Sequence, residues 1–386
     1  MSYVFLSSLV ILIVEGGVMK KNRLVQKGLK GVFFILVPLL AAGLSLSSPA
    51  MAQQIILDGI THAELVINGN TTDVTVNGPV VGGNAFIAFQ KFNVDSGNVV
   101  NLVVPSAAQN LVCIITSASN PTMIAGALNS VKNGQIGGQA FIVNPAGITV
   151  FSERTVNLGS ATFVTSTTDF VDNFFAGTDT PDPASVAALL AGTAPINETS
   201  MILNMGAIAL LKGLDMNAGT IINTGSIITN SVETGDIVNL RAISQVTVAG
   251  AIDGGKIEVT GGEVRIVADN VDLADGQINA DSAVLSRYSA GNMSIRDQKY
   301  SDPTDLQLTP AELGTISANS LTLGNSDVTN TYVNDLVFDT DLSLANSLTV
   351  VASRVTEGMK SVEVSGDLLL VGVSGSIKVY QLWELK

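Results

Sequence analysis

Histidine and cysteine, the side chains most used for nucleophilic and metal chemistry, each occur once in this sequence of 386 residues. A catalytic triad or a Cys–His pair needs a histidine base beside its nucleophile, and a multi-histidine metal site needs several imidazoles. His62 lies between Thr61 and Ala63, where we expect an exposed strand end. Cys113 lies in the apolar run LVCII, which predicts a buried small hydrophobe. A single cysteine also excludes an intrachain disulfide.

Acidic residues are the remaining candidates for catalysis, and their spacing in the sequence does not predict a cluster. The chain has 33 Asp and Glu against 19 Lys and Arg, a formal net charge of −14. Nucleic-acid binding depends on Lys and Arg that displace counterions, so this charge argues against a nucleic-acid partner. Acids in the middle of the chain stand singly near expected turns, which predicts a solvated surface: Asp236, Glu258, Glu263, Asp269, Asp272 and Asp281. The sequence has no phosphate loop and no glycine-rich calcium array, and we expect neither metal nor cofactor.

Short strands are the elements that must position these residues. Val and Thr, which favour strands, recur along the chain together with Gly and Asn, which favour the turns that end them. Apolar and polar residues alternate over four to six positions, the period of a strand with one buried face. Examples are residues 63–68, 73–77, 85–89, 99–104 and 139–143.

A loose repeat of Gly, any residue and Ile begins near residue 200. It occurs at Gly206, Gly219, Gly225, Gly250, Gly276, Gly314 and Gly375. From Gly225 to Gly250 and on to Gly276 the steps are 25 and 26 residues, and further short strands lie within each step. Such a period is typical of stacked units that bury their apolar faces against their neighbours. It predicts an all-β fold, a right-handed parallel β-helix with a few extra-helical strands. A β-sandwich with irregular hairpins is the alternative.

Two segments depart from this pattern. Residues 178–194 carry Pro183 at an expected helix start, an Ala/Leu run, and Gly192 just past its end. They predict one short helix inserted between coils. Residues 296–309 are polar, and we expect a loop there.

The N-terminus has the pattern of a signal peptide. A basic stretch at residues 20–30 precedes the apolar run of residues 31–46, which is shorter than the roughly 20 residues that span a membrane. Ala50 and Ala52 are the small residues that a signal peptidase reads, so we expect cleavage between Ala52 and Gln53. Met19 is a plausible true start, and removal of the basic stretch makes the mature chain more acidic. A signal peptide implies Sec-dependent export.

Residues 89–166 resemble the secretion domain of two-partner secretion exoproteins, the filamentous-haemagglutinin and high-molecular-weight-adhesin type. Four pieces in the family's order carry the resemblance: FQKFNV from Phe89 with Gly97, NP with IAG at residues 120–126, GQAFIVNPAGI at residues 138–148, and VNLGS at residues 156–160. Residues 200–290 resemble the coils that follow that domain. Two departures are Ala146, where the family has Asn, and the additional residues 130–134.

The resemblance implies residues 53–200 as the secretion domain and 201–386 as β-helix repeat coils, with truncation of a longer adhesin as an alternative for the second part. It implies a Gram-negative cell, export through an outer-membrane β-barrel transporter with periplasmic recognition domains, and a secreted or cell-surface adhesin that meets a host-cell or surface receptor. The residues it suggests for transporter recognition are Phe92, Asn93, Val94, Asn144, Pro145, Gly147 and Ile148. For Asn93 and Asn157 the residue type also fits an inward amide that satisfies backbone groups. We expect a protein that is not an enzyme, and a carbohydrate-active enzyme on a β-helix is the alternative.

Overall fold

Parallel strand pairing runs through the described part of the chain. The computed structural model describes residues 54–230, 235–249, 255–300, 304–325, 333–357, 360–372 and 377–378. The predicted signal segment, with Ala50, Ala52 and Gln53, lies outside these residues, as does the Gly250 repeat unit. Within them, no helix is long and apolar enough to cross a bilayer.

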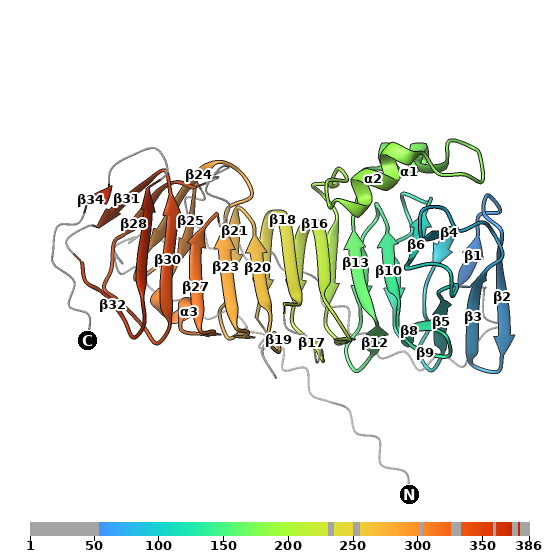
Figure 1. Cartoon of the computed structure of the whole chain (residues 1–386), viewed down its shortest axis with the longest axis horizontal. Helices are drawn as coiled ribbons and strands as arrows, with labels where there is room; N and C mark the ends of the chain where they lie inside the picture. The colour runs from blue at the N-terminus through green and yellow to red at the C-terminus, as the bar shows by residue number, and fades with distance from the viewer. Residues whose placement is uncertain are drawn as a thin grey trace, which may run out of the picture. The chain divides into compact units, whose positions relative to one another are not determined.

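The largest sheet has 16 strands. Its main path, in spatial order, is β1 (Ile55–Leu57), β4 (Asn84–Phe92), β6 (Asn110–Ile115), β10 (Gln139–Val143), β13 (Ser160–Val164), β16 (Leu214–Asn223), β18 (Ile237–Val248), β20 (Glu263–Val267), β23 (Ser282–Ser286), β27 (Ser320–Gly324), β30 (Ser347–Ala352) and β33 (Leu368–Gly372). Off this path lie β7 (Thr122–Ile124), β11 (Ile148–Val150), β14 (Met201–Asn204) and β21 (Asn270–Asp272). Figure 1 shows the main path side by side from the blue to the red end of the described chain.

A second sheet of 11 strands runs beside it. Its members are β2 (Ala63–Asn68), β3 (Thr71–Val76), β5 (Val99–Val103), β8 (Ala127–Lys132), β9 (Gln135–Ile136), β12 (Thr155–Leu158), β15 (Ala207–Leu210), β17 (Ser226–Thr229), β19 (Lys256–Val259), β22 (Gln277–Asn279) and β26 (Ile316–Ser317). Two smaller sheets hold β24 (Gly291–Ile295), β25 (Asp305–Leu308), β28 (Val333–Phe338), β31 (Arg354–Glu357) and β34 (Ile377–Lys378), and β29 (Leu342–Leu344) with β32 (Val362–Val364).

Each strand of one coil pairs in parallel with the corresponding strand of the next coil. For example, β8, β10 and β11 pair in parallel with β12, β13 and β14 of the next coil. This arrangement is a parallel β-helix, so the predicted fold class is confirmed and the β-sandwich alternative is wrong. The extra-helical strands are the antiparallel pair β2–β3, β1 against β4, and β9 against β8.

Most described units of the Gly-x-Ile repeat mark one corner and the strand after it, whereas Gly219 lies inside β16 and its Ile221 pairs with β14. Ile208, Ile227, Ile257, Ile278 and Ile316 stand in register on five neighbouring strands and are all buried. The unit between Gly225 and Gly276 begins at Gly255, not at Gly250, so the even predicted step is wrong. A Cβ on Gly225 would lie 2.0 Å from the Gly206 carbonyl oxygen. The glycine is therefore required because successive corners touch through their backbones.

The helical insertion is larger than predicted and lies within a coil. Helices α1 (Thr168–Phe175) and α2 (Pro183–Leu190) both connect β13 to β14 and lie together in Figure 1. Pro183 opens α2, and the Asp182 carboxylate caps it by accepting from Ser185 N–H at 2.8 Å. The expected single helix between coils missed α1, whose apolar side (Val171, Phe174 and Phe175) is buried.

The segment at residues 296–309 is not only a loop. It contains β25, which pairs in parallel with β24, and it leads into a short helix, α3 (Pro310–Leu313). Buried Leu306 and Leu308 alternate with polar residues there. The polar residues around them conceal this strand in the sequence.

Candidate recognition corner and lateral groove

The segment Phe92-Asn93-Val94 is buried where β4 ends. Its side chains are 1%, 8% and 1% exposed. Asn93 Oδ1 accepts a hydrogen bond from Met123 N–H at 2.9 Å, and its Nδ2 donates to Gln54 Oε1 at 3.3 Å. Val94 forms a parallel bridge with Ile124 of β7. Asn93 therefore joins the N-terminal strand, the end of β4 and the next coil.

Asn144 is fully buried and makes three side-chain hydrogen bonds. Its Nδ2 donates to the Asn120 carbonyl oxygen at 2.9 Å and to Thr122 Oγ1 at 3.0 Å. Its Oδ1 accepts from Ala146 N–H at 2.8 Å, which closes the predicted turn. This amide satisfies donors and acceptors of two coils where water is absent.

The rest of the turn contacts the following coil. The Pro145 carbonyl oxygen accepts from Asn197 Nδ2 at 3.0 Å and from the Ser200 hydroxyl. Gly147 has φ 110°, and a Cβ there would lie 2.9 Å from the Met201 carbonyl oxygen. Ile148, 1% exposed, opens β11.

The structure thus brings the seven predicted recognition residues to neighbouring coils. Strand β7 lies between them, because it is bridged by Val94 on one side and pairs with β11 on the other. We call Asn93, Asn144 and the ends of β4, β7 and β11 the asparagine corner. All seven residues are buried. In the folded chain they hold coils together and present no contact surface, and a role in recognition stays a prediction.

Asn157 does not point inward as expected. Asn101, Asn129 and Asn157 occupy one register position on β5, β8 and β12, and each Nδ2 donates to the preceding residue of the column. The column starts at Asp73, which accepts from Asn101 at 2.7 Å. Its members are partly exposed between buried neighbours such as Val156 and Leu158. It is an outward ladder along the second sheet.

The other residues singled out in the sequence lie apart from this corner. Cys113 is buried in β6, where burial raises the pKa of its thiol. His62 is exposed, and its Nε2 lies 3.7 Å from Asp179 Oδ2 at the helical insertion. Among the described residues, no group of three or more His, Cys, Asp or Glu could hold a metal ion.

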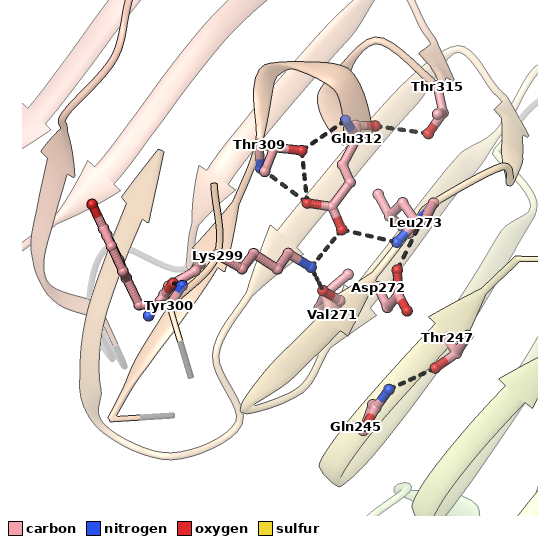
Figure 2. A network of polar contacts seen from close by, with 12 residues as sticks. Gln245, Thr247, Val271, Asp272, Leu273, Lys299, Tyr300, Thr309, Glu312 and Thr315 are labelled. Carbon is pink, nitrogen blue, oxygen red and sulfur yellow. Dashed lines mark hydrogen bonds and ion pairs between the residues drawn. The ribbon is translucent and has the colours of Figure 1, made fainter. Parts of the chain in front are cut away.

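An acid–base cluster forms where the 296–313 insertion meets β21, and Figure 2 shows its contacts. Glu312 Oε1 accepts from Lys299 Nζ at 2.5 Å and Leu273 N–H at 3.2 Å, while Oε2 accepts from Thr309 N–H at 2.9 Å and Oγ1 at 3.0 Å. Lys299 Nζ also donates to the Val271 carbonyl oxygen at 2.6 Å. Because the buried carboxylate already accepts four hydrogen bonds, the pair fastens the insertion and caps α3.

A lateral groove lies on the outer face of the main sheet, beside the end of α2. Two adjoining hollows of about 200 and 440 Å³ share Gln139, Asp215 and Asn239 as lining residues. Arg241 lines the smaller hollow and Arg265 the larger one. The expectation that acids stand singly on the surface is wrong here, because the groove gathers Asp215 and Asp236 with basic residues. The sequence could not show this, since the gathering depends on the register of β13, β16, β18 and β20.

Asp215 is the most perturbed acid of this groove. Burial raises the pKa of its carboxyl, while the Asn239 side chain and the charge of Arg265 act the other way. Asn239 Nδ2 donates to Asp215 Oδ1 at 3.1 Å. Arg265 follows Asp215 and Asn239 in the strand register. Its Nη2 lies 2.6 Å from Glu263 Oε1, so Arg265 forms an ion pair with a residue of its own strand.

Comparison with solved structures gives the following likeness for this chain. It is similar to the crystal structure of the HMW1 secretion domain from Haemophilus influenzae, at 15% sequence identity and a TM-score of 0.36, over 82% of this chain and 94% of that chain. No protein-family profile and no curated protein matches the sequence. A likeness at this level supports no conclusion about what the chain does.

Proposed function

We propose that the chain is a secreted or cell-surface exoprotein of a two-partner secretion system, with a β-helix that serves adhesion. The observation that carries the proposal is the asparagine corner. Motifs from separate parts of the sequence, around Asn93 and Asn144, meet on adjoining coils near the N-terminal end of the β-helix, as a secretion domain that folds as one unit requires.

The architecture suits passage through a narrow pore. Each coil pairs with its neighbours only, so folding can start at the N-terminal coils and propagate as the chain emerges. One buried cysteine leaves no disulfide to form before transport. The antiparallel strands β1, β2 and β3 begin the stack and give the first parallel strands a partner to pair with.

Burial of the motif residues constrains how the transporter reads them. Because Asn93 and Asn144 are buried in the folded chain, the periplasmic recognition domains must contact them before the corner closes. An extended segment can add a strand to a partner's sheet edge, which uses backbone hydrogen bonds with modest side-chain selectivity. The transporter then holds the same residues that later join the coils.

Export assays with single variants test the proposal. The full chain is expressed with the outer-membrane transporter of its own genome, and Asn144→Ala and Asn93→Ala are compared with Asn223→Ala. Asn223 is a matched control because it is fully buried in a later corner and hydrogen-bonded through its side chain to Asn204 and to the Lys256 carbonyl oxygen. We expect the first two variants to lose export and the control to keep it.

Stability measurements separate recognition from folding. Each variant's free energy of unfolding is measured on refolded protein, because removal of a buried hydrogen-bonding amide costs about 1–3 kcal/mol at either corner. If export falls only in proportion to stability in all three variants, the corner is structural alone. If residues 201–386 behind the signal segment are secreted without residues 53–200, the secretion-domain assignment is wrong.

Processing has its own test. The basic stretch and the Ala50 to Ala52 pattern predict a mature N-terminus at Gln53. Protein sequencing of the exported chain should therefore begin there. A product that keeps residues 20–46 and stays with the inner membrane contradicts the signal peptide.

A further inference from the structure

One outward column of the main sheet changes character at the end of the helical insertion. Parallel register aligns its members across neighbouring strands, from Phe86 on β4 to Val284 on β23: Phe86, Val112, Phe141, Thr162, Asp215, Asn239, Arg265 and Val284. The first three pack against α1 and α2 in a second hydrophobic cluster. The next four are polar or charged and line the lateral groove. Thr162 lines the smaller hollow, Arg265 lines the larger one, and Asp215 and Asn239 line both.

The groove has two unlike sides. Leu190 at the end of α2, 42% exposed, supplies apolar surface beside the smaller hollow, while Leu189 and Phe141 beneath it are buried. Gln139, Thr162 and the row that follows supply amide, hydroxyl and carboxylate groups. Gln139 Nε2 donates to Thr162 Oγ1 at 3.2 Å, and Arg241 Nη1 donates to the Gly192 carbonyl oxygen at 3.2 Å, so the groups are held in place from both sides.

Polar atoms of the groove are incompletely satisfied within the protein. Asn239 Oδ1 and Asp236 Oδ2 are buried and make no hydrogen bond to any described residue. Asp215 lines the groove with both of these residues, and burial raises the pKa of its carboxyl. Unpaired buried polar atoms are uncommon in folded proteins and cost stability, so these two atoms mark a part of the groove where the hydrogen bonding within the protein is incomplete.

We propose that the lateral groove binds a neutral saccharide chain. Neighbouring parallel strands are about 4.8 Å apart, so the column offers a new polar side chain at each step, close to the length of one sugar unit. Planar amide and carboxylate groups can each bond to adjacent hydroxyls, and the apolar side suits the C–H face of a sugar ring. The lining carries Asp215 and Asp236 against Lys212, Arg241 and Arg265, and Arg265 is itself paired with Glu263. With Glu263 included the charges cancel, which favours an uncharged ligand. The proposal is independent of the export route.

Calorimetric titration of the purified chain tests it with defined probes. These are hexasaccharides of β-1,4-glucose, α-1,4-glucose and β-1,4-mannose, with polygalacturonate and heparin as polyanionic comparators. We expect at least one neutral hexasaccharide to bind, and Asn239→Ala to weaken that binding tenfold or more. Asp215→Asn, which can still accept from Asn239, keeps the fold and should weaken it severalfold.

Asn101→Ala is the matched control, because Asn101 is also an outward, partly buried asparagine, but on the ladder of the second sheet. It should leave saccharide binding unchanged. The proposal is overturned if no neutral hexasaccharide binds, or if binding persists unchanged in Asn239→Ala and Asp215→Asn. Binding of the polyanions alone also overturns it, and would point to a charged ligand.

Discussion

The outer face of the main sheet differs between two regions that share one inner core. Over β4, β6, β10 and Val164 of β13 it carries apolar residues covered by α1 and α2, whereas from Thr162 of β13 across β16, β18 and β20 it is mainly polar and uncovered. Inward positions of both regions are apolar and belong to one continuous hydrophobic core. The inward side chains therefore determine how the chain coils. The helical insertion determines where the outward side chains of the main sheet can be apolar.

The helical insertion is part of the fold of the covered region. Phe174 is fully buried between Phe86 of β4 and the neighbouring rings of α1, with centroid distances of 6.2 Å to Phe86 and 5.2 Å to Phe175. Without the helices, Phe86 and Phe141 would face water. The uncovered region needs no such cover because most of its outward residues are polar, and among the described exposed large hydrophobic residues only Ile237 lies in the lining of the larger hollow there.

The largest effect is expected at Phe174. Phe174→Ala removes the ring that links α1 to β4 and should cost about 3–5 kcal/mol. Leu190→Ala, on exposed surface of the same insertion, should change stability by less than about 0.5 kcal/mol. Chemical denaturation measures both. A similar small loss in the two variants would show that the helices rest loosely on the sheet.

Gly225→Ala tests the corners that both regions need. The added Cβ would meet the Gly206 carbonyl oxygen at 2.0 Å, so the coils must separate, at a cost of about 1–3 kcal/mol. Gly314→Ala belongs to the same sequence repeat but lies after α3, where the nearest atoms are 3.3 Å away. The melting temperature should fall clearly for Gly225→Ala and little for Gly314→Ala. Equal shifts would contradict the close-contact explanation.

Much of the coil could be predicted from the sequence, because alternation and Gly-x-Ile are local signals. Strands β2 and β10 occupy the predicted residues 63–68 and 139–143. Helix α1 was missed although Phe170, Val171, Phe174 and Phe175 are spaced as on one face of a helix, because the segment has only eight residues and its burial depends on Phe86, far away in sequence. The spacing of Gly225, Gly255 and Gly276 was missed because coils differ in length.

The candidate sites were predictable to different degrees. The Asn144 turn follows from Asn, Pro and Gly in sequence, but its contacts with Asn120 and Thr122 depend on the stacking of β7 and β11. Asn157 was placed on the wrong side, although its position between Val156 and Leu158 in an alternating strand indicates the outward face. The lateral groove needs the register of β16, β18 and β20, which no local pattern contains.

Cys113→Ala tests the inner core under the covered region. The thiol is buried in β6 and belongs to the inner hydrophobic cluster, so its loss should cost about 1–2 kcal/mol. Because burial raises the pKa of this thiol, it should not react with a disulfide reagent until the chain unfolds. Thiol titration before and after addition of denaturant measures this. Rapid reaction of the folded chain would show that the coil opens there.

The smallest effect is a pH dependence that distinguishes the two regions. Asp215 lies in the uncovered groove, and burial raises the pKa of its carboxyl. An acid with a higher pKa in the folded chain costs stability once it ionises, so its contribution to the free energy of unfolding falls as pH rises from the unfolded-state to the folded-state pKa. Asp215→Asn should therefore raise the melting temperature at pH 7 relative to the wild type, and not at pH 3.

Asp182, which caps α2 in the covered region, should behave in the opposite way. Hydrogen bonds from Ser185 lower the pKa of its carboxyl, so its stabilising contribution is present above the unfolded-state pKa and is lost as pH falls through the folded-state pKa. Asp182→Asn keeps a capping side chain but removes the charge, and should lower the melting temperature at pH 7 with little change at pH 3. Melting curves of both variants between pH 3 and pH 7 measure the two signs. Shifts of the same sign would mean that Asp215 is held by its neighbours as a stabilising charge, and the groove would then be a structural network.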